Sequence, residues 1–179
     1  MHSPLAASFT LACAIFASPH AAAQEWPAKP LRWVVPSAPG DGSDSVGRLL
    51  ADKLAKALGQ SIVIDNKPGA GGVLGSEFVA KSAPDGYTMI VGNAGSHGIN
   101  AAIYTKLAYD VLRDFVPVAL ICTAPNVMVA SPGSKVATVA EFVAYARANA
   151  GQVNYASGGI GSSSHLSAEL FKSLAGIEM

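Results

Sequence analysis

The stretch LRWVVPSAPGDGSD, residues 31–44, decides the fold. Residues 31–36 form a short apolar run with valine and tryptophan, which predicts a buried β-strand. The glycine loop behind it leads into a helix that we expect Ser43 or Asp44 to cap and Gly59 to end. The apolar residues of this helix recur at helical spacing: Val46, Leu49, Leu50, Leu54 and Leu58. A strand, a glycine loop and a helix in this order predict the start of an α/β unit.

The same unit continues along the chain. Residues 61–65 predict a second strand, a turn at residues 67–72 enters a second helix, and residues 87–91 predict a third strand. Strands that alternate with helices over short links predict a parallel sheet with right-handed crossovers. Ligands of such sheets bind beyond the carboxyl ends of the strands, where the glycine-rich loops of this chain fall.

The C-terminal third predicts a second α/β unit. Residues 115–120 indicate one strand and a crossing point between domains, and Val127–Ala130 indicates the first strand of the new unit. A capping box at Thr138 and Glu141 starts a helix that ends at residues 149–151. A strand at residues 153–155 and a final helix with Leu166, Leu170 and Leu174 on its apolar face follow. Because no strand follows that helix, we expect an incomplete second domain: domain one at 24–122 and domain two at 123–179.

The composition excludes several classes of partner. The chain has 12 basic and 12 acidic residues, and only 13% of its residues are charged. A balanced charge without a basic cluster argues against nucleic acid and against anionic membrane surfaces. The histidines are scattered, and only one cysteine lies after residue 23, so the sequence has no metal-binding spacing. We therefore expect no metal and no cofactor. We expect that cysteine, Cys122, to be a small buried apolar residue.

The first 23 residues predict a signal peptide. Residues 5–17 form an apolar run of the right length, and residues 21–23 offer an alanine cleavage site before Gln24. The chain is therefore expected in the periplasm. A lipid anchor at Cys13 is disfavoured, because Thr10 stands where a lipidation motif prefers a large aliphatic side chain.

Two glycine- and serine-rich helix starts suggest a site for an anion. ASGGIGSSSH, residues 156–165, opens the final helix, and the loop at residues 36–44 opens the first. Unpaired amides at a helix start, together with the helix dipole, favour negative charge. With a third loop at residues 93–97, the candidate ligand-binding residues are Pro39, Gly40, Gly42, Ser43, Asp44, Asn93, Gly95, Ser96, His97, Ser157, Gly158, Gly161, Ser162, Ser163, Ser164 and His165.

Structural interpretations compete with ligand binding at several of these positions. For Asp44 the helix cap is the favoured interpretation, His97 and His165 are candidates for packing or a helix start, and residues 157–164 could be a flexible linker. The turn at residues 69–72 either enters a helix or lines the edge of a cleft. Neither the glycines at residues 40, 42 and 47 nor those at residues 69–72 have the spacing of a dinucleotide-binding or P-loop motif.

An enzyme is not expected. The chain has no G-x-S-x-G elbow, and no third group is evident beside Ser96–His97 or Ser164–His165. Neighbouring side chains on a helix point about 100° apart, which disfavours a hydrogen bond within either pair. A serine-dependent α/β hydrolase remains the alternative.

Several motifs in order along the chain resemble the Bug-type periplasmic receptors of tripartite tricarboxylate transporters. They are WPAKPLR (26–32), residues 36–44, NKPGAGG (66–72), APDGYT (83–88) and NYASG (154–158) continuing to Ser164-His165-Leu166. The resemblance implies a periplasmic-binding-protein-like α/β clamshell of type II-like form. It also implies a small carboxylate held between the domains by amides, hydroxyls and water, and membrane subunits of a transporter as partners. The three loops would line that cleft.

Two departures from the family pattern bear on function. The first loop of the family usually reads Pro-Phe-Pro-Pro-Gly-Gly, whereas this chain has Ser37, Ala38 and Asp41. An acidic side chain there would repel a carboxylate unless it points outward or faces a ligand amine. Family members are also about twice as long as the mature chain, so a non-functional truncated fragment is a further alternative.

Overall fold

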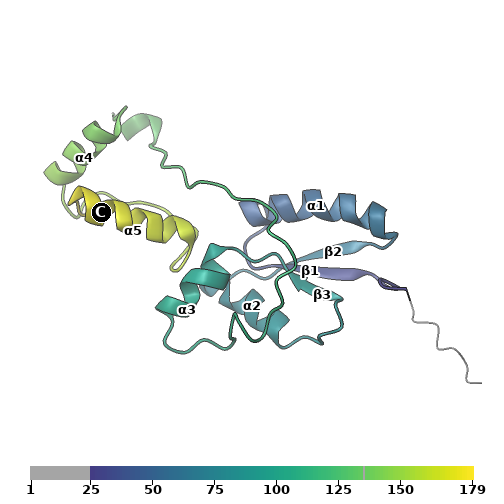
Figure 1. Cartoon of the computed structure of the whole chain (residues 1–179). Helices are drawn as coiled ribbons and strands as arrows, with labels where there is room; N and C mark the ends of the chain where they lie inside the picture. Colours follow the sequence, from purple (N-terminus) through teal and green to yellow (C-terminus); the bar gives the residue numbers. More distant parts are fainter. Residues whose placement is uncertain (1–24, 135) are drawn as a thin grey trace, which may run out of the picture.

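A three-stranded parallel sheet forms the core of the molecule (Figure 1). The computed structural model describes residues 25–134 and 136–179, so the predicted signal peptide and Cys13 lie outside the described residues. The strands β1 (Leu31–Val35), β2 (Ile62–Asn66) and β3 (Thr88–Ile90) run in the order β2-β1-β3. Leu31 lies opposite Ile62, and Arg32 lies opposite Thr88. The three predicted strands of the first unit are confirmed.

Helices cover both faces of this sheet, as a parallel sheet requires. The helix α1 (Gly42–Leu58) packs Ala51 and neighbouring leucines against Leu31, Trp33 and Val35, which alternate onto one face of β1. On the other face, Arg32 lies over the ring of Phe78 in α2 (Val73–Ala80), which follows the short turn η1 (Ala70–Gly72). Gly59 ends α1 at a φ of 65°, as predicted.

The chain continues past β3 into a short helical region and then loses regular structure. The π-helical turn η2 (Gly95–Ile99) leads into α3 (Asn100–Ile103), and the turn η3 (Pro132–Ser134) is the next element. The strands predicted at residues 115–120 and 127–130 are wrong for this structure, since both runs lie in coil. A strand needs a neighbour to complete its hydrogen bonds, and none lies beside these runs in the described chain.

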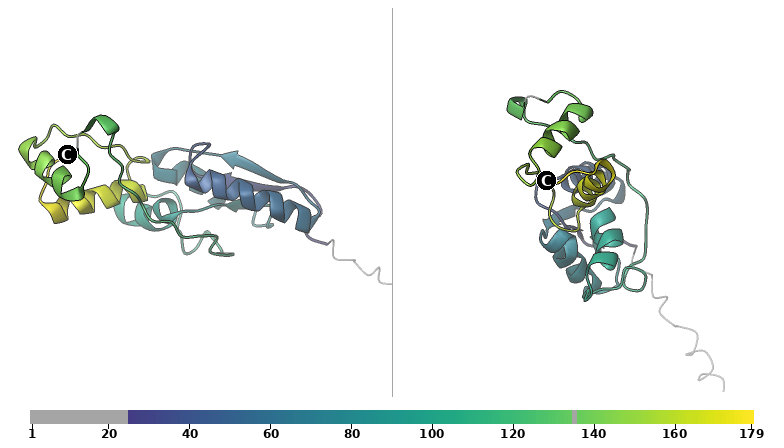
Figure 2. Two further views of the ribbon diagram at one scale, coloured as in Figure 1. Left: turned by 90° about the horizontal axis from the view of Figure 1, so that it is seen from above. Right: turned by 90° about the vertical axis from the view of Figure 1, so that its left-hand side faces the viewer.

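Two helices complete the described chain and lie beyond the carboxyl ends of the strands (Figure 2). They are α4 (Val139–Ala148) and α5 (Ser163–Ala175), joined by a contact between the rings of Phe142 and Phe171. The N-cap half of the capping box is confirmed, because the Thr138 hydroxyl accepts from the Glu141 amide at 3.2 Å. The Glu141 carboxylate accepts from the Ala137 amide at 2.8 Å, one residue before the amide that a capping box uses. The strand predicted at residues 153–155 is wrong, as this segment is coil.

The predicted apolar face of α5 is largely uncovered. Leu170 is 60% exposed and Leu174 is 80% exposed, whereas Phe171 makes the contact with α4. The second region thus has the expected helices without the expected sheet. The domain boundary at residues 122 and 123 stays a prediction.

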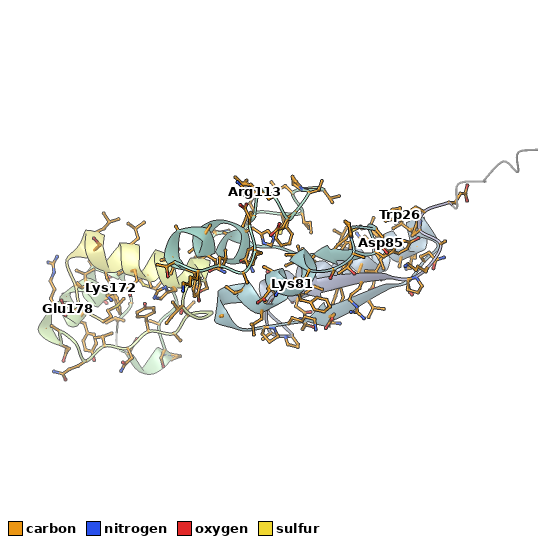
Figure 3. All side chains as sticks on the ribbon, turned by 90° about the horizontal axis from the view of Figure 1, so that it is seen from below. Trp26, Lys81, Asp85, Arg113, Lys172 and Glu178 are labelled. Atoms are coloured by element: carbon orange, nitrogen blue, oxygen red, sulfur yellow. The ribbon has the colours of Figure 1, made fainter. Side chains whose placement is uncertain are left out.

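Figure 3 shows how the two ends of the molecule differ. Trp26 and Asp85 lie at the end of the sheet that is remote from α5, where the Trp26 ring contacts that of Tyr87. Lys172 and Glu178 lie at the opposite end, on and after α5. Among residues 25–134 and 136–179, no helix combines the length and the apolar character needed to cross a bilayer.

Candidate functional site

Two carboxylates stabilise the first loop, residues 36–44, through hydrogen bonds to its own amides. Asp41, not Ser43 or Asp44, is the N-cap of α1, and its carboxylate accepts from the Gly42 amide at 2.6 Å. Asp44 lies one turn further on, is 3% exposed and accepts from the Gly40 amide at 2.8 Å. Both acidic residues therefore use amide groups that a ligand carboxylate would otherwise meet.

Asp44 is the centre of a polar network that holds this loop on β2. Its oxygens accept from Arg48 Nε at 3.0 Å and from Asn66 Nδ2 at 2.9 Å, and Arg48 also donates to Asn66 Oδ1 at 2.9 Å. The hydrogen bond from Arg48, followed by those from Gly40 and Asn66, lowers the pKa of Asp44 to about 2. The prediction that Asp44 caps the helix is wrong, and its carboxylate instead fixes the shape of the loop.

The second loop is joined to the first and is tightly folded. Asn93 and Ser96 bond reciprocally: the Asn93 amide donates to Ser96 Oγ at 3.1 Å, and the Ser96 amide donates to Asn93 Oδ1 at 3.0 Å. The side chain of Asn93 also reaches Ser43 Oγ at 3.5 Å. Tyr109 donates its hydroxyl to the Ser96 carbonyl at 2.6 Å, so residue 96 is closed from both sides and is fully buried.

Ser96 and His97 contact each other, contrary to the sequence-based expectation. Ser96 Oγ lies 2.8 Å from His97 Nδ1. The segment Gly95–Ile99 is a π-helical turn, which has more residues per turn than an α-helix and brings neighbouring side chains closer together. The geometry of a hydrolase is nevertheless missing. Ser96 is inaccessible, and His97 packs edge-on against Phe115, where burial lowers its pKa and favours the neutral ring.

The third loop curls around the start of α5. Ser162 is the N-cap of this helix and accepts from the His165 amide at 3.2 Å. The Gly158 amide donates to Ser164 Oγ at 3.0 Å, and Gly159 and Gly161 both have positive φ. A flexible linker would not show this pattern of internal hydrogen bonds. Residues 157–160 are nevertheless exposed to solvent. The loop is a preformed helix start with an open outer side.

Glycines let the third loop lie directly on the sheet region. A Cβ atom on Gly71 would come within 2.6 Å of the Ile160 carbonyl oxygen, and one on Gly95 within 3.0 Å of the Gly161 oxygen. A Cβ atom on Gly161 would meet Asn100 Oδ1 at 2.7 Å. Such approaches are open only to residues without side chains. The turn at residues 69–72 therefore contacts the third loop as well as entering α2.

Asn100 is the residue of this junction that the sequence did not reveal. It is fully buried, and its Nδ2 donates to the Gly71 carbonyl at 3.0 Å. Its Oδ1 faces Gly161 without a hydrogen-bond partner in the described chain. An asparagine at the start of a short helix gives no local signal, because its partners come from distant parts of the sequence.

The loops carry little net charge and no metal-ligand cluster. No lysine or arginine lies in residues 39–44, 93–97 or 157–165, and Arg48 balances Asp44. Over the described ranges, no group of three or more His, Cys, Asp or Glu side chains could hold a metal ion. Cys122 is exposed, so its predicted burial is wrong. Two open hollows of about 410 and 510 Å³ lie elsewhere, at the C-terminal ends of α5 and α1.

Comparisons with known proteins agree with this architecture. A family model described as "Tripartite tricarboxylate transporter family receptor" matches residues 46–179. Protein BugT of Bordetella pertussis is 37% identical over 151 residues, which are 84% of this chain and 46% of BugT. A UPF0065 protein from the tcbD-tcbE intergenic region of Pseudomonas sp. (strain P51) is 36% identical over 154 residues, 86% of this chain and 46% of that protein.

Solved structures of similar proteins share the fold. An R. palustris protein solved with adipate has a TM-score of 0.84 and 39% identity, over 86% of this chain and 52% of that one. MatC from Rhodopseudomonas palustris with bound malate has a TM-score of 0.72 and 36% identity, over 85% and 52%. The periplasmic binding protein BugD has a TM-score of 0.71 and 30% identity, over 86% and 51%.

The predicted fold class and the resemblance are both confirmed by these matches. The chain spans about half the length of the curated relatives it matches. The ligand-binding roles of the sixteen candidate residues stay predictions. The chain belongs to the family of tripartite tricarboxylate transporter receptors.

Proposed function

We propose that this chain is the solute-binding part of an exported receptor, which captures a small carboxylate and delivers it to the membrane subunits of a transporter. The observation that carries the proposal is the junction of three glycine- and serine-rich loops beyond the carboxyl ends of the strands. Parallel sheets bind ligands at this edge. Relatives solved with adipate and with malate support a carboxylate as the ligand class.

The exposed side of the third loop is best suited to hold the carboxylate. Residues 157–160 are open to solvent and lie at the positive end of α5, a helix of 13 residues. Each hydrogen bond to a charged group contributes about 1.5–3 kcal/mol. Three or four of them, less the cost of ordering, reach the roughly 8 kcal/mol of a micromolar complex.

The first loop contributes differently. Asp41 is exposed and occupies the Gly42 amide, so a ligand carboxylate next to it would meet negative charge. The ligand would therefore place its carboxylate toward α5 and a neutral or cationic group toward Asp41. Ser43, whose hydroxyl is tied to Asn93, would line the side of the site between them.

Calorimetry tests the proposed binding. The ligands would be adipate, malate, glutamate and nicotinate. They would be titrated into the chain itself and into a fusion that carries, after Met179, the part of BugT that this chain does not match. We expect a micromolar complex with at least one ligand in the fusion and weaker binding in the chain alone.

A matched pair of variants locates the site. Ser163→Ala should weaken binding, whereas Ser61→Ala, at the remote end of the sheet before β2, should not. A folded fusion that gives no heat with any of the four ligands would contradict the proposal.

Export has its own test. The proposed signal peptide predicts that the chain, expressed in a Gram-negative bacterium, accumulates in the periplasm with Gln24 as its first residue. The mass of the intact periplasmic protein checks this. Recovery of the full chain from the cytoplasm, with Met1 or His2 as its first residue, would show that the proposed export is wrong.

A further inference from the structure

Residues 116–129 form an apolar segment that the described chain leaves uncovered. Its large apolar side chains are between 42% and 87% exposed: Val116, Val118, Leu120, Ile121, Val127, Met128 and Val129. These are the residue types of a protein interior, where most valine and leucine side chains lie. Exposed apolar runs of this kind mark an interaction surface.

The segment has the pattern of two β-strands. In an extended chain, side chains two residues apart point to the same side, so Val116, Val118 and Leu120 share one face. Val127 and Val129 do the same in the second run. Within the part of the chain that the structure describes, the main-chain hydrogen bonds include none from residues 116–129. Side-chain propensity and free main-chain groups together favour strand pairing.

The apolar segment is held at two points. Before it, the Phe115 ring packs at 4.7 Å from that of His97 and at 5.7 Å from that of Tyr109. Within it, Asn126 donates to Ser167 Oγ of α5 at 2.8 Å. Figure 1 shows the chain leaving α3 as a long ribbon, and the short turn η3 is the next helical element before α4. The first run therefore lies between two held points, and the second run directly follows Asn126.

We propose that the apolar segment pairs, as two edge strands, with the half of a tricarboxylate-receptor polypeptide that this chain does not match. The lengths of the relatives indicate which polypeptide would pair with the apolar segment. BugT and the adipate-bound structure match this chain over 46% and 52% of their lengths, so each carries about as much polypeptide again. A second copy of this chain would bring its own three-stranded sheet and the same two unpaired runs, but not the polypeptide that these relatives carry in addition.

Co-expression tests this pairing. The 179-residue chain is produced together with an affinity-tagged copy of the part of BugT that it does not match, and amide exchange is measured in the purified complex. We expect a complex in which amides of residues 116–129 exchange at least about tenfold more slowly than in the chain alone, because paired amides are protected. A homodimer of the chain that excludes the BugT part would overturn the proposal.

A covalent fusion covers the case in which the separate BugT part does not fold. With that part joined after Met179, the same amides should be protected in a protein that melts cooperatively. A folded fusion in which they exchange as fast as in the chain alone overturns the proposal. Failure of both formats to give a folded complex also counts against it, since pairing is the event it asserts. Neither readout depends on a ligand, so the proposed carboxylate binding can fail separately.

Substitutions inside and outside the two runs provide the control. Val118→Asp together with Val129→Asp should reduce recovery of the complex about tenfold or more, which corresponds to about 1.4 kcal/mol. Leu112→Asp is the matched control, because Leu112 is 92% exposed but lies in a turn tied to Asp110, outside both runs. Equal losses for the double variant and for Leu112→Asp would show that general hydrophobicity, not strand pairing, governs the complex.

Discussion

The sheet region at residues 25–103 and the region at residues 104–179 respond differently to similar sequence patterns. In the first, each of three apolar runs became a strand with a neighbour at hydrogen-bonding distance. In the second, three runs with the same residue types stayed in coil, although both helices formed. Helices satisfy their hydrogen bonds internally, whereas strands depend on a partner from elsewhere. Strand propensity therefore indicates where pairing can occur, not that a partner is present.

The largest expected effect concerns the core of the sheet region. Trp33 is 7% exposed between β2 and β3, and Trp33→Ala should lower the free energy of unfolding by about 3–5 kcal/mol. Leu170→Ala, on the uncovered face of α5, should cost less than about 1 kcal/mol. Urea denaturation followed by circular dichroism checks both. Equal losses would mean that the two regions are equally well packed, contrary to the structure.

The junction between the two regions gives the next largest effect. Gly161→Ala should cost about 1–3 kcal/mol, because alanine resists a φ of 83° and its Cβ atom would press on Asn100. Gly159→Ala is the control, since Gly159 also has positive φ but a Cβ atom there meets nothing within 4 Å. Hydrogen exchange at the start of α5 should increase more for the Gly161 variant. If the two variants behave alike, backbone strain alone explains the effect and the close approach is unimportant.

A smaller effect follows from the network at Asp44. The pKa of this carboxyl is about 2 in the folded chain and 3.8 as the ordinary value, so its contribution to stability is fully present above about pH 4. The contribution is lost as the pH falls from there toward 2. In Asp44→Asn the free energy of unfolding should therefore vary less between pH 4 and pH 2 than in the unchanged chain. Parallel curves for the two proteins would show that Asp44 does not supply this pH dependence.

The smallest expected change in stability is at Asp41. Asparagine caps helices about as well as aspartate, so Asp41→Asn should alter stability by no more than about 0.5 kcal/mol. It should nevertheless increase the affinity for a dicarboxylate, because the negative charge beside the first loop is removed. Calorimetry with adipate measures this. An unchanged affinity would place Asp41 outside the reach of the ligand.

Local signals explain which parts of the fold could be predicted from the sequence. The alternating apolar residues of β1, the left-handed Gly59 and the N-cap at Thr138 depend on neighbours within a few residues, and all three were confirmed. The N-cap of α1 was misplaced because Asp41, Gly42, Ser43 and Asp44 are all good caps in one continuous run. Only the contacts of their side chains separate them.

Non-local contacts explain what could not be predicted at the candidate site. Asn100 and Gly71 contact the third loop, whose residues lie about sixty to ninety positions further along the chain. Asn100 contacts Gly161, and Gly71 contacts Ile160. The contact between Ser96 and His97 depends on a π-helical turn, which is rare and has no simple sequence pattern. The position of the three loops at one edge of the sheet, by contrast, follows from the parallel topology that the pattern of strands and helices indicates.

The proposed ligand site is tested by titrating adipate into the isotope-labelled chain and following the NMR shifts of its main-chain amides. We expect the largest shifts in residues 39–44 and 157–164, the first and third loops, between which the proposed site places the ligand. Shifts confined to the hollow at Glu169–Glu178, or no saturable shifts at millimolar adipate, would contradict it.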